Sequence, residues 1–161
     1  MIEDEFCGLF AQQIRNSPSF TEWVLGHTKF AHVAAEARLL AEELEKRKAK
    51  FWWRHWWARV PEVGRESETD ILLLFGIGDA VERFAIHVEA KVDAVFSPFQ
   101  PQDYAARGRQ MATDPRLLYS DFDTVIIAPR LYLERYPVEC GHFGSAISFE
   151  DIAAHIPAFA F

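Results

Sequence analysis

Apolar residues recur along this chain with two different periods, and each period predicts a different kind of element. From Ser19 to about Lys50 they recur every three or four residues, which predicts one long helix, or two helices if Gly26 interrupts it. Ser19 and Glu22 have the spacing of a capping box at its start. Shorter helices are expected over residues 5–15, 100–112 and 147–157, the last with Ser148 as its N-cap.

Four segments have the composition or the alternation typical of β-strands. They span residues 51–60, 68–75, 83–96 and 122–129. Turn residues from Gly76 to Glu82 separate the second segment from the third, so these two are expected to pair as antiparallel neighbours. The resulting order is helix, strand, strand, strand, helix, strand, helix. It predicts an α/β fold in which helices flank a mixed central sheet.

The length and composition favour one domain that spans residues 1–161. A chain of 161 residues with 50% hydrophobic content can form one substantial core. No basic start with an apolar stretch and no run of roughly 18 to 20 apolar residues is present, so we expect a cytoplasmic protein without a membrane partner. Cys7 and Cys140 lie far apart and have no metal-ligand spacing, which argues against a disulfide framework or a structural zinc site.

Charge is distributed unevenly along the chain. The net charge is -7, but residues 46–65 contain seven basic residues and one acidic residue, a local charge of +6 against -13 elsewhere. This segregation can attract a polyanion to one face of the protein. Lys50, Arg54 and Arg59 of this segment are candidate contacts for DNA phosphates, and Arg107 on the later helix is a candidate that extends them.

Acidic and basic side chains occupy every second position in part of the third predicted strand. Because alternate residues of a strand face opposite sides, one face is apolar and the other carries His87, Glu89, Lys91 and Asp93. Glu89 and Lys91 are then about 7 Å apart along the strand. Asp70 stands at the start of the neighbouring apolar strand, where antiparallel pairing can bring its carboxylate beside that of Glu89.

Two carboxylates and an ammonium group at the end of a sheet can support metal-dependent hydrolysis. Mg²⁺ prefers oxygen ligands and binds through one or two carboxylates, several waters and a substrate phosphate. A bound metal lowers the pKa of its water and neutralises charge in the transition state. Asp70 and Glu89 are therefore candidate ligands for Mg²⁺ or Mn²⁺, and Lys91 is the candidate that positions or activates the water.

These residues resemble the motif of the PD-(D/E)XK nuclease superfamily. Asp70 is followed by Glu89-Ala90-Lys91, and Gln100 and Tyr104 form a Gln-x-x-x-Tyr signature on the next helix. The resemblance implies a restriction-endonuclease-like α-β-β-β-α-β core over roughly residues 20–130. It also implies catalytic work for Lys91, supporting roles for Gln100 and Tyr104, and hydrolysis of DNA phosphodiester bonds.

The sequence differs from that motif in two respects. One is the proline that precedes the Asp in the superfamily's name, and the other is an acidic residue on the first core helix. Thr69 replaces the proline. Many members also use an acid from the first core helix, for which this chain offers Glu22 and Glu36, and the sequence does not choose between them.

Simpler interpretations compete with each of these features. Alternating charges are ordinary on a solvated face of an antiparallel sheet, which is the alternative for Glu89 and Lys91. The four tryptophans between Trp52 and Trp57 suit base stacking, but at least one alternating pair is better explained by core packing or by a homodimer contact. The sequence therefore predicts a Mg²⁺-dependent nuclease, with a non-catalytic binding or dimerisation module of the same fold as the alternative.

Overall fold

The protein has an α/β fold built on a mixed five-stranded sheet. A computed structural model describes residues 1–47, 50–61, 64–79 and 82–160. The sheet has the order β1-β4-β5-β6-β7, with bounds Arg38–Leu39, Ile71–Ile77, Glu82–Ala90, Asp121–Ala128 and Ser145–Ser148. β4 is antiparallel to β1 and to β5, whereas β5, β6 and β7 are mutually parallel. Two further strands, β2 (Trp56–Val60) and β3 (Arg65–Thr69), pair in a separate antiparallel hairpin.

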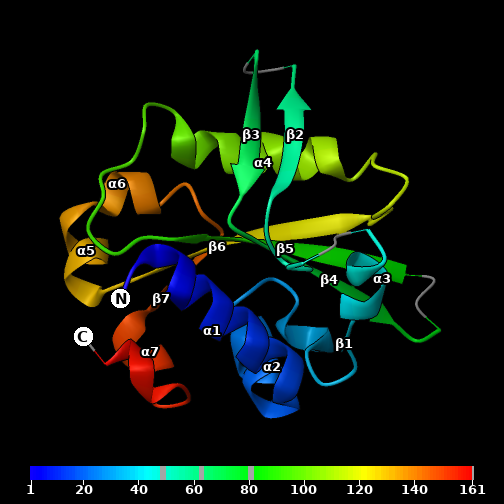
Figure 1. The fold of residues 1–161 in the computed structure, drawn as a ribbon, viewed down its shortest axis with the longest axis horizontal. Coiled ribbons are helices and arrows are strands. Elements are labelled where there is room, and N and C mark those ends of the chain that lie inside the picture. The colour runs from blue at the N-terminus through cyan, green and yellow to red at the C-terminus, as the bar shows by residue number, and fades with distance from the viewer. Residues whose placement is uncertain (48–49, 62–63, 80–81, 161) are drawn as a thin grey trace.

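Helices cover both faces of the five-stranded sheet. The helices are α1 (Glu3–Asn16), α2 (Pro18–Leu25), α3 (Ala41–Glu45), α4 (Gln100–Met111), α5 (Arg130–Arg135), α6 (Pro137–Cys140) and α7 (Phe149–Ile152), with 3-10 turns η1 (Ala31–Val33) and η2 (Pro157–Phe159). Figure 1 shows α4 on one side of the sheet and α1, α2 and α7 on the other. The hairpin of β2 and β3 passes beside α4 and extends beyond it (Figure 1), and both strands contact this helix.

The apolar strands β4 and β5 form the centre of the core. All residues from Ile71 to Gly76 are buried, and so are all residues of β5 from Phe84 to Ala90. Residues of this run that face α1 pack with its apolar side chains, among them Phe6 and Phe10. Each buried aliphatic or aromatic side chain contributes about 1.5 to 3 kcal/mol relative to full exposure. Burial on both faces fixes the register of β5, because a slip by one residue would exchange its two sets of side chains.

The continuous helix expected from Ser19 to about Lys50 is wrong, whereas the interruption considered at Gly26 is confirmed. α2 ends at Leu25, where Gly26 lies at the C-cap and the Thr28 hydroxyl donates to the Leu25 carbonyl at 2.7 Å. The chain then forms η1, the two-residue strand β1 and the short helix α3. The N-cap of α2 is also Ser17 rather than Ser19, since the Ser17 side chain accepts from the Phe20 amide at 3.2 Å.

The strands differ from those of the predicted mixed sheet in two places. The segment 51–60 forms a strand only from Trp56 to Val60, and it pairs with β3 instead of joining the five-stranded sheet. The segment 68–75 is divided at Asp70, where β3 ends and β4 begins. Asp70 thus stands at the point where the chain leaves the hairpin and enters the sheet.

The predicted C-terminal helix is shorter than expected, although its start is confirmed. Ser148 caps α7, and its hydroxyl oxygen accepts from the Asp151 amide at 3.1 Å. α7 ends at Ile152, so the remainder of the predicted span is a turn followed by η2. Among the described residues, no helix is long and apolar enough to cross a bilayer.

Candidate active site

The sheet topology brings Asp70 and Glu89 to the same edge of the sheet. β4 and β5 are antiparallel with Ile71 opposite Val88, so the start of β4 meets the end of β5. The Asp70 carboxylate accepts a hydrogen bond from the Ala90 amide at 3.0 Å. The Tyr104 hydroxyl lies 3.4 Å from the Asp70 amide and also donates to the Glu89 carboxylate, so the two acidic residues lie close together. The predicted convergence of these two carboxylates is therefore observed.

Glu89 is the centre of a cluster of polar side chains. Its Oε1 accepts from Gln100 Nε2 at 2.7 Å and lies 3.2 Å from Lys91 Nζ, while its Oε2 accepts from the Tyr104 hydroxyl. Lys91 Nζ also donates to Gln100 Oε1 at 3.3 Å. Hence Asp70, Glu89, Lys91, Gln100 and Tyr104, which we call the carboxylate cluster, are linked by direct contacts.

The first turn of α4 sets the positions of Gln100 and Tyr104. Residues four apart lie on the same face of a helix, so both side chains point at the end of β5. Phe99 precedes Gln100 with a left-handed backbone, φ of 64°, which is uncommon for an aromatic residue. Gln100 Oε1 also accepts from the Ser97 amide at 3.0 Å, so this side chain closes the loop in addition to contacting Lys91 and Glu89.

Glu89, Lys91 and Tyr104 of the cluster are buried, while Asp70 and Gln100 are partly exposed at its edge. Glu89 is 1% exposed and Lys91 is 6% exposed, so the alternative of a solvated strand face is wrong. Burial, and then the charge of Glu89, raises the pKa of Asp70 well above its ordinary value. Burial and the charges of Asp70 and Glu89 likewise raise the pKa of Tyr104. Two adjacent carboxylates in a low-dielectric site favour a proton or a cation between them.

Neither of the two acids predicted from the first helix reaches this cluster. Glu36 is exposed just before β1, and the pairing of Arg38 with Gly76 places it near the opposite end of β4, about 20 Å from Asp70. Glu22 is exposed on α2. Of the described acids of the N-terminal helices, Glu3 comes beside the cluster, where its carboxylate accepts from the Val92 amide at 3.0 Å. No periodic signal in the sequence distinguishes Glu3, because it lies in the first turn of α1.

The donor set of the cluster consists of two carboxylates. In the part of the chain that the structure describes, no group of three or more His, Cys, Asp or Glu side chains could hold a metal ion. Mg²⁺ nevertheless retains several waters and is commonly bound by one or two carboxylates together with substrate phosphates. Asp70 and Glu89 fit that requirement. They do not fit a zinc site, which needs three or four protein ligands.

The predicted DNA-contacting residues have different surroundings. Lys50 and Arg59 are exposed, and Arg54 forms an ion pair with Asp4. Arg107 is 1% exposed and donates to side chains of β3, so the prediction of an exposed phosphate contact at this residue is wrong. The helical pattern alone does not show that the hairpin of β2 and β3 covers this face of α4.

Most of the tryptophan-rich segment belongs to the core, as the simpler interpretation holds. Trp52, Trp53 and Trp56 are buried, and the Trp56 indole donates to the Trp52 carbonyl at 2.8 Å. Trp57 is 53% exposed on β2. Only this last ring is therefore available to a partner within the segment 52–57.

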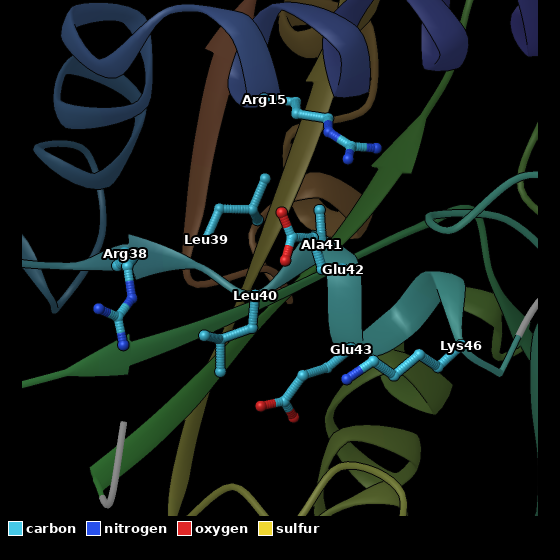
Figure 2. A pocket seen from close by; sticks show the side chains of 8 residues that line it. All are labelled: Arg15, Arg38, Leu39, Leu40, Ala41, Glu42, Glu43 and Lys46. Atoms are coloured by element: carbon cyan, nitrogen blue, oxygen red, sulfur yellow. The ribbon is translucent and has the colours of Figure 1, made fainter. Parts of the chain in front are cut away.

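A cavity of about 500 Å³ lies far from the carboxylate cluster. Figure 2 shows its lining, which comes from the end of α1, from β1 and from α3. Two ion pairs, Arg15 with Glu45 and Arg83 with Glu43, hold its surroundings together. Because β1 pairs with the Gly76 end of β4, the cavity and the cluster lie at opposite ends of that strand. The cavity contains none of the residues that the motif predicts.

A second surface cavity lies beside the cluster. It has a volume of about 480 Å³ and is lined by Met1, Ile2, Glu3, Asp4, Val92, Asp93 and Ala94.

Comparisons of the chain with family models, curated proteins and solved structures found no match. The geometry of the carboxylate cluster is consequently the basis on which a function can be argued.

Proposed function

We propose that the protein is a Mg²⁺-dependent nuclease that hydrolyses phosphodiester bonds of DNA. The observation that carries the proposal is the convergence of Asp70 and Glu89 at one edge of the sheet, around the Tyr104 hydroxyl, with the Lys91 ammonium 3.2 Å from Glu89. A buried like-charged pair is unfavourable by itself, whereas a divalent cation turns it into a favourable site. Strongly perturbed ionisable groups of this kind occur preferentially at functional sites.

The order of elements around the cluster supports a restriction-endonuclease-like core. In chain order, the N-terminal helices are followed by β1, β4 and β5 of the main sheet, then by α4 and β6. This is the α-β-β-β-α-β order that the motif implies, with α3 and the hairpin of β2 and β3 inserted between β1 and β4. The short strand β1 takes the place that the tryptophan-rich segment was expected to fill.

Each residue of the cluster has a chemical task in this proposal. Asp70 and Glu89 would hold the metal ion, which supplies a lowered water pKa and charge neutralisation when bound. The Lys91 ammonium orients the attacking water and stabilises negative charge on the phosphoryl oxygens. Gln100 bridges Lys91 and Glu89 and so fixes their separation. Tyr104 donates to Glu89 and limits the rotation of that carboxylate.

The hairpin of β2 and β3 supplies a basic surface next to the cluster. β3 leads directly into Asp70, so the hairpin is attached at the edge of the site. Arg59 and Arg65 on its strands are exposed, and Lys50 and Arg54 precede it. Two of these four groups already form ion pairs, Arg65 with Asp103 and Arg54 with Asp4. Basic groups at these positions would bind the phosphate backbone by a salt-dependent interaction that does not read sequence.

Cleavage assays with a matched lysine control test this proposal. Purified protein is incubated with single-stranded and duplex DNA in Mg²⁺, Mn²⁺ or EDTA. We expect metal-dependent cleavage that falls at least about 100-fold in Lys91→Met, the usual contribution of a positioned proton-transfer group. Lys29→Met removes an exposed lysine that pairs with Asp121 near the opposite end of β5 from Glu89, and it should leave the rate unchanged. Absence of cleavage in every metal, or equal rates for the wild type and Lys91→Met, would refute the catalytic proposal.

One observation favours a non-catalytic module instead. Both oxygens of Glu89 already accept hydrogen bonds, from Gln100 and Tyr104, so this acid also has a structural use without metal. In that case the exposed Trp57 and the basic hairpin would bind DNA or a second copy of the chain. Calorimetric titration with Mn²⁺ separates the two functions, because a nuclease site gives a binding heat that Asp70→Asn abolishes. A module gives none, and its self-association would appear in sedimentation velocity.

A further inference from the structure

A second group of polar side chains is buried directly beneath the carboxylate cluster. It consists of Ser67, Thr69, His87, Arg107 and Tyr119, which we call the core network, and each member is less than 9% exposed. Arg107 Nε donates to Thr69 Oγ1 at 2.7 Å, and its Nη1 donates to the Ser67 hydroxyl. The network therefore joins α4 to the end of β3, immediately before Asp70.

The donors and acceptors of the core network have one consistent arrangement. The Tyr119 hydroxyl donates its single proton to the Gly108 carbonyl, so it accepts from His87 Nε2, 3.1 Å away. A neutral imidazole with its proton on Nε2 accepts at Nδ1, here from the Thr69 hydroxyl at 2.8 Å. Burial and the charge of Arg107 lower the pKa of His87 to about 3, which keeps the ring neutral. Thr69 is thus held from two sides.

Arg107 is connected to both carboxylates of the cluster through their immediate supports. On one side it holds Thr69, the residue next to Asp70. On the other, its guanidinium carbon lies 3.9 Å from the centre of the Tyr104 ring, and the Tyr104 hydroxyl donates to Glu89. The Asp70 amide also lies 3.4 Å from that hydroxyl oxygen. A displacement of the guanidinium would therefore move the supports of both carboxylates.

Burial of the Arg107 guanidinium at this position is energetically unfavourable. Among the described side chains, Arg107 Nη2 has no hydrogen-bond partner, and no carboxylate contacts the guanidinium. A charge removed from water is unfavourable by several kcal/mol unless other charges compensate it. One nearby negative charge is that of Asp103, which is 5% exposed, lies four residues before Arg107 on α4 and pairs with Arg65. The others are those of Asp70 and Glu89, and they oppose the charge of Arg107 in their effect on Tyr104. Packing alone does not account for a guanidinium here.

We infer that Arg107 is a positioning residue that sets the separation and orientation of Asp70 and Glu89, and through them the metal affinity of the pair. The inference rests on the proposed metal-dependent function. Its chemical content is a planar group with several donors that holds Ser67 and Thr69 while it stacks on Tyr104. Lysine has one ammonium group and no planar face, so it cannot replace all three contacts.

Mn²⁺ affinity, measured by calorimetry on the full chain, tests the inference. Arg107→Lys and Thr69→Val each remove part of the support without touching either carboxylate, whereas Thr69→Ser retains the hydroxyl. We expect the first two to weaken Mn²⁺ binding by about 10- to 100-fold, the usual effect of groups that orient metal ligands. Thr69→Ser should bind nearly as well as the wild type. Arg109→Lys is the matched control, since Arg109 is exposed on the same helix.

Unfolding measurements on each variant distinguish a loss of folding from a loss of Mn²⁺ affinity. Thermal unfolding is followed for every variant, and affinities are measured well below each midpoint, so that a variant is compared only in its folded form. Thr69→Ser and Thr69→Val keep the test decisive if Arg107→Lys does not fold. Wild-type affinity in folded Arg107→Lys or Thr69→Val overturns the positioning role while leaving the nuclease proposal intact. If the wild type itself binds no Mn²⁺, both the inference and the proposed function fail.

Discussion

The carboxylate cluster and the core network share one face of β5 but satisfy their polar groups in opposite ways. In the core network, a neutral His87 has a donor on one side and an acceptor on the other. Two positions along the strand, Glu89 lies close to a second acid, and burial followed by the charge of Glu89 raises the pKa of Asp70. The first arrangement stabilises the fold, whereas the second stores repulsion that a cation would relieve. The comparison predicts opposite responses to mutation.

Acid should produce the largest difference between the two groups. The folded-state pKa of His87, about 3, lies below its unfolded value of 6.5. The unfolded chain therefore binds a proton that the folded chain excludes. The contribution of His87 to the free energy of unfolding is fully present above pH 6.5 and is lost as the pH falls toward 3. The free energy of unfolding decreases by about 1.4 kcal/mol per pH unit from this residue.

A urea denaturation series on wild type and His87→Gln isolates that contribution. Glutamine retains a donor and an acceptor but does not titrate, so groups common to both proteins cancel. We expect the stability advantage of the wild type to shrink by about 3 kcal/mol between pH 7 and pH 4. An advantage that does not change with pH would show that His87 is protonated in the folded protein and that the assigned network is wrong.

Asp70→Asn should produce a smaller effect of opposite sign. A raised folded-state pKa means that stability is greatest below the unfolded value of 3.8 and falls as the pH rises through the folded one. Asparagine removes the repulsion while its side-chain oxygen can still accept from Ala90. In metal-free buffer at pH 7 we expect a gain of about 1 to 2 kcal/mol, typical when a strained functional group is neutralised.

Chemical denaturation of Asp70→Asn with and without Mn²⁺ checks this reversal. Metal binding stabilises only the wild type, so added Mn²⁺ should reduce or reverse the gain. Asp93→Asn is the matched control, because Asp93 is exposed just after β5. A loss of stability in metal-free Asp70→Asn would mean that the pair is a satisfied structural contact, like the core network.

Removal of an exposed ion pair should change the free energy of unfolding least. It provides a reference for the carboxylate cluster and the core network. Lys29 Nζ lies 2.5 Å from Asp121 Oδ1, and both side chains are about half exposed. Water already solvates such charges, so Lys29→Gln should change the free energy of unfolding by less than about 1 kcal/mol. The change should diminish in 0.5 M salt because of screening. A larger loss in thermal or urea unfolding would indicate that the Lys29 side chain also contributes through its contacts with the Phe30 and Phe122 rings.

The central part of the site could be predicted because it depends on local periodicity. Alternation along a strand puts Glu89 on the same face as His87, and helical spacing puts Gln100 and Tyr104 on one face of α4. The position of Asp70 follows once β4 and β5 pair as neighbours. These steps involve short separations along the chain, for which the hydrophobic pattern carries most of the information.

The remaining features depend on contacts that periodicity does not encode. Strand pairing between distant segments determines that β1 rather than the tryptophan-rich segment joins the main sheet. The packing of the hairpin on α4 determines that Arg107 is buried. The turn after α2 determines that Glu36 lies far from Asp70, while Glu3 reaches Val92 from the other side of the sheet. Each is a tertiary choice among elements of similar local propensity.

The uneven burial of the tryptophans gives the hairpin an intrinsic optical probe. All five tryptophans lie in described segments, and Trp57 on β2 is the exposed one, at 53%, while Trp52, Trp53 and Trp56 are enclosed. Collisional quenchers dissolved in the buffer therefore reach the indole of Trp57 far more readily than those of the three enclosed tryptophans, whereas Trp23 on α2 is half-buried. Its emission comes from the same strand as Arg59, so a polyanion bound along the hairpin would shield this ring and leave the spectrum of the core tryptophans almost unchanged.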